Sequence, residues 1–292
     1  MVKLLNYSHK LLYCLLVLSF LSSCDKKDII YKRNYSEEEK LALSESLMNA
    51  AGTDFYYQGS VGERMIIHEG NSYNPESAWG QRELGVPYLK RGFAAEANKY
   101  YKMATEYDEE EWLGYKAYCW LYFYRDYETA LEEIDRFDAL TPGVVDYPQS
   151  TSVNYMRGIC YLQLARYEEA IDALTLHLNK EIADVGHQYI EALPYLSLAM
   201  SYHKTEQYEK ADSLYSLGIQ HNNSTSDLYY YKAANLIKMN RVEEAKSSFA
   251  IAQEWFDKGS KNARPYVEEF FAIYQEDLDS LKDQLGVGLL LN

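Results

Sequence analysis

Apolar residues along the chain recur at the three- and four-residue spacing of helices rather than at the two-residue spacing of strands. In the middle of the chain, Tyr155, Ile159 and Leu162 mark one face of a helix, and Ala170 and Leu174 mark a face of the next. A few residues between the two faces leave room only for a tight turn. The pattern therefore predicts two short helices that fold against each other as a hairpin.

This pattern returns four more times in the same phase. A small anchor residue begins the apolar face of each second helix, and the five anchors are Ala97, Ala130, Ala170, Ala211 and Ala245. Twelve residues before each anchor stand Gly85, Tyr118, Gly158, Ala199 and Ala233. Four residues after each anchor stand Tyr101, Ile134, Leu174, Tyr215 and Phe249. We expect the large residues to fill the space that the small ones leave, with Tyr118 as the one departure.

The repeat resembles the tetratricopeptide repeat (TPR) family, whose unit is about 34 residues of helix, turn and helix. The resemblance implies an all-α fold, a right-handed superhelix (α-solenoid) of about five to six helix hairpins followed by a C-terminal capping helix. It implies repeat-packing roles for Gly85, Ala97, Ala130, Gly158, Ala170, Ala199, Ala211 and Ala245. Seven residues after the anchor, Phe137 and His177 make the second and third full units less regular.

Breaks in the pattern divide the chain. We expect residues 1–23 to form a signal peptide, 24–35 a tether, 36–77 a degenerate N-terminal hairpin, 78–257 five TPR units, and 258–292 a capping helix and tail. Ser36 and Glu39 have the spacing of a capping box. Pro265 suits a first helical position, and Tyr266 to Leu285 repeat apolar residues at helical spacing. Residues 143–150 and 181–188 lengthen two links, either as contact loops or as tolerated insertions.

The N-terminus predicts export. Lys3 and Lys10 precede an apolar core, residues 11–21, that is too short to span a membrane. The following Leu-Ser-Ser-Cys sequence resembles the lipobox of bacterial lipoproteins, which implies that Cys24 becomes an acylated N-terminus. A plain secretory signal with a chance cysteine and an uncleaved anchor are the alternatives. We expect a lipid-anchored protein of the cell envelope. The expected location is the outer membrane, with the protein facing the periplasm or the exterior. The sequence leaves open the choice between inner and outer membrane and the orientation.

The net charge of the chain limits the classes of partner that it can bind. The chain has 44 acidic residues against 29 lysines and arginines, a net charge of -15. This charge repels phosphate backbones and anionic lipid surfaces, so we expect no nucleic acid and contact with the membrane through the N-terminal lipid only. Cys119 and Cys160 lie in apolar helical contexts, which favours buried thiols over a disulfide.

Nothing in the sequence indicates catalysis. The metalloprotease, nucleophile-elbow, phosphate-loop and paired CxxC motifs are absent, and the six histidines are scattered. Acidic pairs such as Glu168 and Glu169 lie at helix starts, where they complement the helix dipole. We therefore predict a protein that is not an enzyme, with no cofactor and no metal site.

Tyrosine is the informative residue, at 30 of 292 positions. Aromatic side chains favour binding surfaces because they offer area and a polar edge at little entropic cost. In the TPR family the first helix of each unit lines a groove, which implies the candidate groove residues Trp79, Arg82, Trp112, Tyr115, Tyr122, Tyr155, His203 and Tyr230. Each of them either contacts a ligand or only packs on the next repeat. One TPR subclass binds the carboxylate end of a peptide with paired lysine, asparagine and arginine side chains on successive first helices. The corresponding helices here contain Arg82, Tyr115 and Tyr155 instead, which argues against a carboxylate clamp.

We therefore expect a lipid-anchored scaffold that binds a protein or peptide partner in the cell envelope. Two alternatives remain open. One is a glycan-binding component of an outer-membrane uptake system, since tryptophan and tyrosine stack well on sugars. The other is an accessory lipoprotein of outer-membrane assembly.

Overall fold

The computed structural model describes residues 34–53 and 56–286. The predicted signal peptide, Cys24, residues 24–33 of the tether and residues 287–292 of the tail lie outside this part, so their roles stay predictions. The predicted all-α fold is confirmed, because the described residues form thirteen α-helices, three short helical turns and no strand. The chain divides into two compact units, Met1–Pro75 and Glu76–Asn292.

The first unit contains one helical hairpin, α2 (Glu37–Ala51) and α3 (Val61–Tyr73). Ser36 and Glu39 form the predicted capping box, since the Glu39 amide donates to Ser36 Oγ and the Ser36 amide donates to the Glu39 carboxylate, at 3.2 and 2.8 Å. The Ser60 hydroxyl caps α3 in the same way. Each helix thus begins at a serine that satisfies its free amides.

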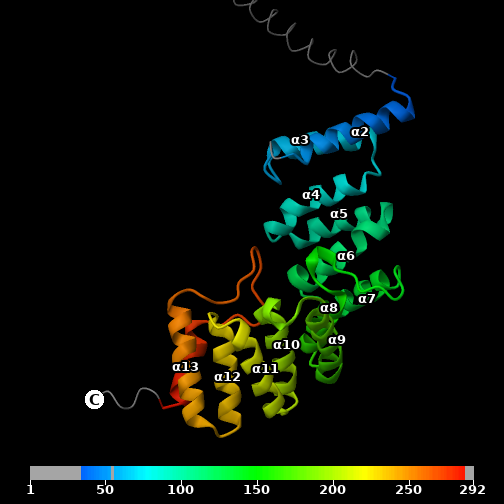
Figure 1. Cartoon of the computed structure of the whole chain (residues 1–292). Coiled ribbons are helices and arrows are strands. Elements are labelled where there is room, and N and C mark those ends of the chain that lie inside the picture. Colours follow the sequence, from blue (N-terminus) through cyan, green and yellow to red (C-terminus); the bar gives the residue numbers. More distant parts are fainter. Residues whose placement is uncertain (1–33, 54–55, 287–292) are drawn as a thin grey trace, which may run out of the picture. The chain divides into compact units, whose positions relative to one another are not determined.

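The second unit contains five hairpins in chain order (Figure 1). Their helices are α4 (Ala78–Lys90) and α5 (Ala94–Tyr107), α6 (Glu109–Cys119) and α7 (Tyr127–Asp138), α8 (Val153–Gln163) and α9 (Tyr167–Val185), α10 (Ala192–Lys204) and α11 (Tyr208–His221), and α12 (Ser226–Lys238) and α13 (Val242–Asp257). Each first helix packs on its own second helix, and each hairpin packs on the next. We call the surface formed by α4, α6, α8, α10 and α12 the first-helix face.

The hairpins cross where the small residues stand. All five anchor alanines have no exposed surface. A Cβ atom at Gly158 would lie 2.4 Å from Leu174 Cγ, and one at Gly85 would lie 2.6 Å from Tyr101 Cε1. The large residue four positions after the anchor therefore occupies the space above the small residue twelve positions before it.

The hairpin of α6 and α7 makes room at its helix crossing with a glycine at a different position. Tyr118 replaces the small residue there, and Phe137 is large where the first, fourth and fifth units have alanine or glycine. Gly114, one helical turn before Tyr118, makes room: a Cβ there would lie 2.7 Å from the end of the Phe137 ring. A glycine outside the repeat's usual position thus compensates for the irregular Phe137.

The turn inside each hairpin contains a residue with left-handed backbone. Gly92 has a φ of 81°, and the four later turns use Arg125, Ala165, Glu206 and Asn240, with φ between 54° and 60°. A residue with a Cβ is strained in this region. The repeat geometry therefore overrides local preference at four of the five turns.

One expected link proves to be partly helical. Residues 181–185 continue α9, which runs for 19 residues and ends at Gly186, and a short turn, η3 (His187–Tyr189), follows. The other long link contains the short turn η2 (Pro148–Ser150). The second insertion therefore lengthens a helix more than a loop.

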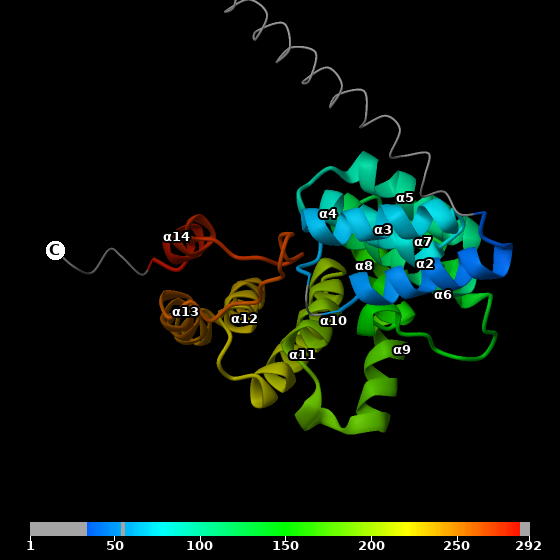
Figure 2. The ribbon, with the colours of Figure 1, turned by 90° about the horizontal axis from the view of Figure 1, so that it is seen from above.

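The C-terminal helix is shorter than predicted. It begins at Gln275, not at Tyr266, and α14 (Gln275–Gln284) packs its leucines on α12 and α13. Residues 258–274 form an irregular segment, here called the return loop, which runs from the end of α13 toward α10 and α8 before it comes back to α14 (Figures 1 and 2). Valine, isoleucine and aromatic residues are weak helix formers, and here tertiary contacts outweigh their helical spacing.

The two thiols of the second unit are free and buried. Cys119 and Cys160 have no exposed surface, and burial raises the pKa of both thiols above their ordinary value. The favoured interpretation of two buried, unreactive thiols is therefore confirmed. Across residues 34–53 and 56–286, none of the helices combines the length and the apolar character that a membrane span requires.

Candidate functional site

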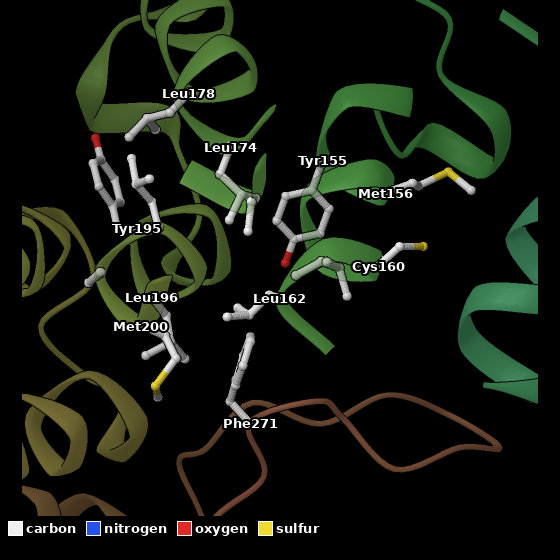
Figure 3. Packing of buried hydrophobic residues seen from close by; sticks show 14 of the residues in the cluster. Tyr155, Met156, Cys160, Leu162, Leu174, Leu178, Tyr195, Leu196, Met200 and Phe271 are labelled. Carbon is white, nitrogen blue, oxygen red and sulfur yellow. The ribbon is translucent and has the colours of Figure 1, made fainter. Parts of the chain in front are cut away.

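The return loop lies across the first-helix face. Phe270 packs on Tyr122 and Tyr127, with ring centroids 5.4 and 6.3 Å apart. Phe271 is 7% exposed and belongs to the main core cluster. Figure 3 shows its ring pointing from the loop toward Leu162 and Met200, on α8 and α10. A non-helical segment of the chain, with Phe270 and Phe271 in a turn, thus occupies the face that the TPR resemblance assigns to a ligand.

Polar contacts fix the start of the loop to the last hairpin. The Ser226 amide donates to the Ser260 carbonyl at 2.9 Å, and the Asn262 amide donates to Asp227 Oδ2 at 2.8 Å. Lys261 Nζ donates to the Ile273 carbonyl at 2.9 Å. This bond joins the part of the loop that leaves α13 to the part that returns to α14. The loop is therefore tethered at its base.

The far end of the return loop reaches the first two hairpins of the second unit. The Arg125 guanidinium donates to the Glu268 carbonyl and lies 4.8 Å from the Phe270 ring centroid. Lys90 Nζ lies 4.8 Å from the centroid of the Tyr266 ring. The loop consequently touches α4, α6 and α7 as well as the hairpins near its base.

Arg264 is the polar anchor of the loop. Its Nη1 donates to the Tyr118 hydroxyl at 2.8 Å, and its guanidinium carbon lies 3.8 Å from the Tyr122 ring centroid. Glu269 of the same loop is its ion-pair partner, at 3.4 Å from Nε, and is 6% exposed. A half-buried cation is therefore held by two tyrosine rings of the scaffold and a carboxylate of the loop.

A wide helical turn positions these tyrosines. Helix α6 ends in the π-helical turn η1 (Trp120–Tyr124), closed by the left-handed Arg125. The rings of Tyr118 and Tyr122 pack together at this end of the helix, with centroids 4.5 Å apart and planes tilted by 43°. Such turns change which side chains face inward, and they occur often at functional sites.

A first cavity, of about 440 Å³, lies between the first helices and the return loop. It is lined by Leu162, Gln163, Tyr167, Met200, His203, Lys204, Tyr215, Tyr230, Tyr231, Ala234, Phe270 and Phe271. Nδ1 of His203 is 2.8 Å from Asn235 Oδ1, and burial lowers the pKa of this histidine, with Lys204 and Lys238 acting in the same direction. The cavity is thus apolar and aromatic with a basic edge.

A second cavity, of about 500 Å³, lies beside Arg264 at the opposite end of α8. It is lined by Tyr122, Tyr147, Ser150, Thr151, Ser152, Tyr155, His177, Glu181, Asp184, Val185, Tyr189, Glu191, Leu193, Pro194 and Arg264. Burial raises the pKa of Glu181, and the nearby Glu191 and Asp184 carboxylates raise it further. Burial lowers the pKa of His177 to about 4, so this histidine is neutral at pH 7. The wall of the second cavity is therefore acidic and aromatic.

The structure brings the predicted groove residues together in three places. Tyr122 and Tyr155 line the second cavity, and His203 and Tyr230 line the first. Tyr155 is 8% exposed, and its hydroxyl lies 3.2 Å from Ser197 Oγ. It offers a ligand little surface in this arrangement.

The third place is a packed junction between the first two hairpins. The Arg82 guanidinium lies 4.4 Å from the Tyr115 ring centroid and 5.3 Å from that of Trp112, and it pairs with Glu83. The Tyr115 hydroxyl is 3.4 Å from that of Tyr101. Trp79 is half-buried on α4 and lines neither cavity.

Sequence reasoning missed the residues that fill the face. Arg264, Glu269, Phe270 and Phe271 lie in the stretch that was expected to begin the capping helix. The available signal was Tyr118, the one large residue at a small position, because it lies under Arg264 rather than at a helix crossing. Among the described residues, no group of three or more histidine, cysteine, aspartate or glutamate side chains is placed to hold a metal ion.

Solved structures with the same fold are TPR proteins. A tetratricopeptide repeat protein from Parabacteroides merdae has a TM-score of 0.59 at 16% identity, over 85% of this chain and 87% of that one. PilW, a type IV pilus biogenesis factor, has a TM-score of 0.58 at 14% identity, over 85% and 99%. MamA from Desulfovibrio magneticus has a TM-score of 0.53 at 19% identity, over 62% and 96%.

These comparisons show the fold alone, because all three identities are low. No family model matches the chain. No curated protein matches it either. The chain is an α-solenoid of TPR type, as its repeat predicted, and its function has to be argued from its own surface.

Proposed function

We propose that the protein is a lipid-anchored scaffold of the bacterial cell envelope that binds a peptide segment of a partner protein on its first-helix face. The observation that carries the proposal is the return loop. This face already holds a non-helical stretch of chain through Phe270 and Phe271, so its shape and chemistry suit a peptide segment of a partner. PilW, which has this fold, is described as a type IV pilus biogenesis factor, a role in assembly.

The first cavity is one part of the face that remains open beside the loop. Its aromatic and apolar lining suits the side chains of a bound segment, and Lys204 is exposed at its edge. Aromatic residues in such places supply most of the binding energy of protein interfaces. We expect a partner segment to enter here.

Photocrosslinking in cells tests the partner-binding proposal. A photoreactive amino acid replaces Lys204 on α10, and the matched control replaces Ser213, which is exposed on α11 of the same hairpin. The proposal predicts a discrete protein adduct from position 204 and none from position 213. Equal labelling from both positions, or labelling from 213 alone, would place the binding surface elsewhere.

The lipid anchor is tested separately. Cells are fed an alkyne-labelled fatty acid, and labelling of the wild-type protein is compared with that of Cys24→Ser. We expect labelling and membrane association of the wild type and loss of both in the variant, because several acyl chains make an anchor effectively permanent. An unlabelled wild-type protein would remove the lipoprotein assignment and leave the binding proposal standing.

A further inference from the structure

The return loop contributes its own counter-charge to the first-helix face. Among the described residues, the one carboxylate within ion-pair distance of Arg264 is Glu269, from the same loop. The scaffold contributes rings: the guanidinium lies on Tyr122 and bonds the Tyr118 hydroxyl. The loop can therefore leave this place without stranding a charge in the scaffold, and the two rings would then be free for another cation.

The cavity beside Arg264 already favours a positive charge. Glu181 and Glu191 line it, and within the described residues neither forms an ion pair with a lysine or arginine. The third acid, Asp184, pairs with Lys180 at 2.7 Å. Neighbouring carboxylates that repel each other are stabilised when a cation enters between them.

A buried side chain in the same wall lacks a partner. His177 is 4% exposed, and its Nδ1 has no hydrogen-bond partner. Its Nε2 is 3.7 Å from the Glu181 carboxylate, beyond hydrogen-bond distance. The hydroxyl of the buried Tyr122 is also unpartnered. Unsatisfied polar groups around a cavity are costly unless a ligand or water completes them.

We propose that this end of the first-helix face is a binding site for an arginine-bearing segment of a partner protein, and that the return loop occupies it in cis with Arg264 as the stand-in. The partner's guanidinium takes the place of Arg264 on Tyr118 and Tyr122. Aromatic residues that follow it take the places of Phe270 and Phe271. The net charge of -15 favours such a basic partner at long range. This inference rests on the proposed function and names the chemistry of its partner.

The test uses two fluorescent peptides and the full-length protein in mild detergent. One peptide has the sequence of residues 261–274, and the other is identical except that the arginine is alanine. Their binding to the wild-type protein, Arg264→Ala and Lys258→Ala is measured by fluorescence anisotropy. Lys258→Ala is the matched control, because Lys258 is a cation at the start of the same loop whose side chain contacts Glu254 and Trp255 of α13.

Arg264→Ala should bind the arginine peptide at least tenfold more tightly than the wild type does, because its site is no longer filled in cis. Lys258→Ala should stay within about twofold of the wild type. The alanine peptide should bind Arg264→Ala at least tenfold more weakly than the arginine peptide. Equal affinities for the two peptides would overturn the arginine site.

Hydrogen exchange gives a second reading that needs no variant. Saturating arginine peptide should speed the exchange of amides 262–272 in the wild-type protein, and the alanine peptide should leave them unchanged. Unchanged exchange with both peptides would mean that the loop is a fixed part of the fold, and would overturn its displacement. If both peptides fail while position 204 still crosslinks a partner, only the arginine site is wrong. If position 204 also captures nothing, the proposed function fails as well.

Discussion

At the scale of single residues, pairs of unequal size set the geometry of each hairpin. Gly158 lies against Leu174, and in the second hairpin Gly114 lies against Phe137. The first pair could be predicted, because both residues occupy regular repeat positions. The second could not, because the compensating glycine lies one helical turn away from the position that the repeat assigns to a small residue.

The crossing of α8 and α9 leaves no room for a larger anchor. Ala170 has no exposed surface, so Ala170→Leu adds atoms to a filled space and should lower the free energy of unfolding by about 1 to 3 kcal/mol. Thermal or urea unfolding measures the loss. Asp172→Leu, which is exposed on the same helix, is the control and should change stability little. An unchanged Ala170→Leu would mean that the crossing is looser than described.

His177 makes stability depend on pH. Its pKa falls from an ordinary value of 6.5 to about 4 in the folded chain because it is buried. As the pH falls through this range, the unfolded chain binds the proton first, so stability is lost between pH 6.5 and 4.

The size of this effect can be measured against a variant that stays neutral. Between about pH 7 and about pH 4.5, the wild type should lose about 2 kcal/mol more than His177→Gln. Urea unfolding at the two pH values measures the difference. Because Glu181 is present in both proteins, its own titration largely cancels. Parallel losses would show that His177 is protonated in the folded chain.

At the scale of elements, regular hairpins were predictable and the return loop was not. The hairpins follow from local spacing, since each first helix contacts the helix that comes next. The return loop depends on partners far away in sequence, such as Tyr118 and Tyr122, which lie more than 140 residues before Arg264. Its apolar residues recur at helical spacing, yet Phe270, Phe271 and Ile273 are packed at separate places in the fold.

Turns offer an element-scale prediction. Ala165 adopts a φ of 57° between α8 and α9. Because glycine adopts this conformation without strain, Ala165→Gly should stabilise the protein by about 0.5 to 1 kcal/mol. Ala165→Val should destabilise it, since a β-branched residue is strained there. Melting temperatures of the two variants on opposite sides of the wild type would support this, and a loss in both would contradict it.

At the scale of the whole molecule, the second unit is a stack of hairpins that carries one of its own segments on its first-helix face. The groove residues drawn from the repeat are real neighbours of that face, yet Tyr115 and Tyr155 are largely covered. Side chains that sequence reasoning placed in the capping helix fill the space instead. A repeat thus predicts where a face lies, and only packing decides what already occupies it.

The central claim is that a partner segment binds the first-helix face. Hydrogen exchange of the full-length protein, with and without the partner captured from position 204, tests it most directly. The account predicts slower exchange in α8, α10 and α12, together with faster exchange in residues 262–272 as the return loop leaves. Protection confined to α9, α11 and α13, with the return loop unchanged, would contradict it.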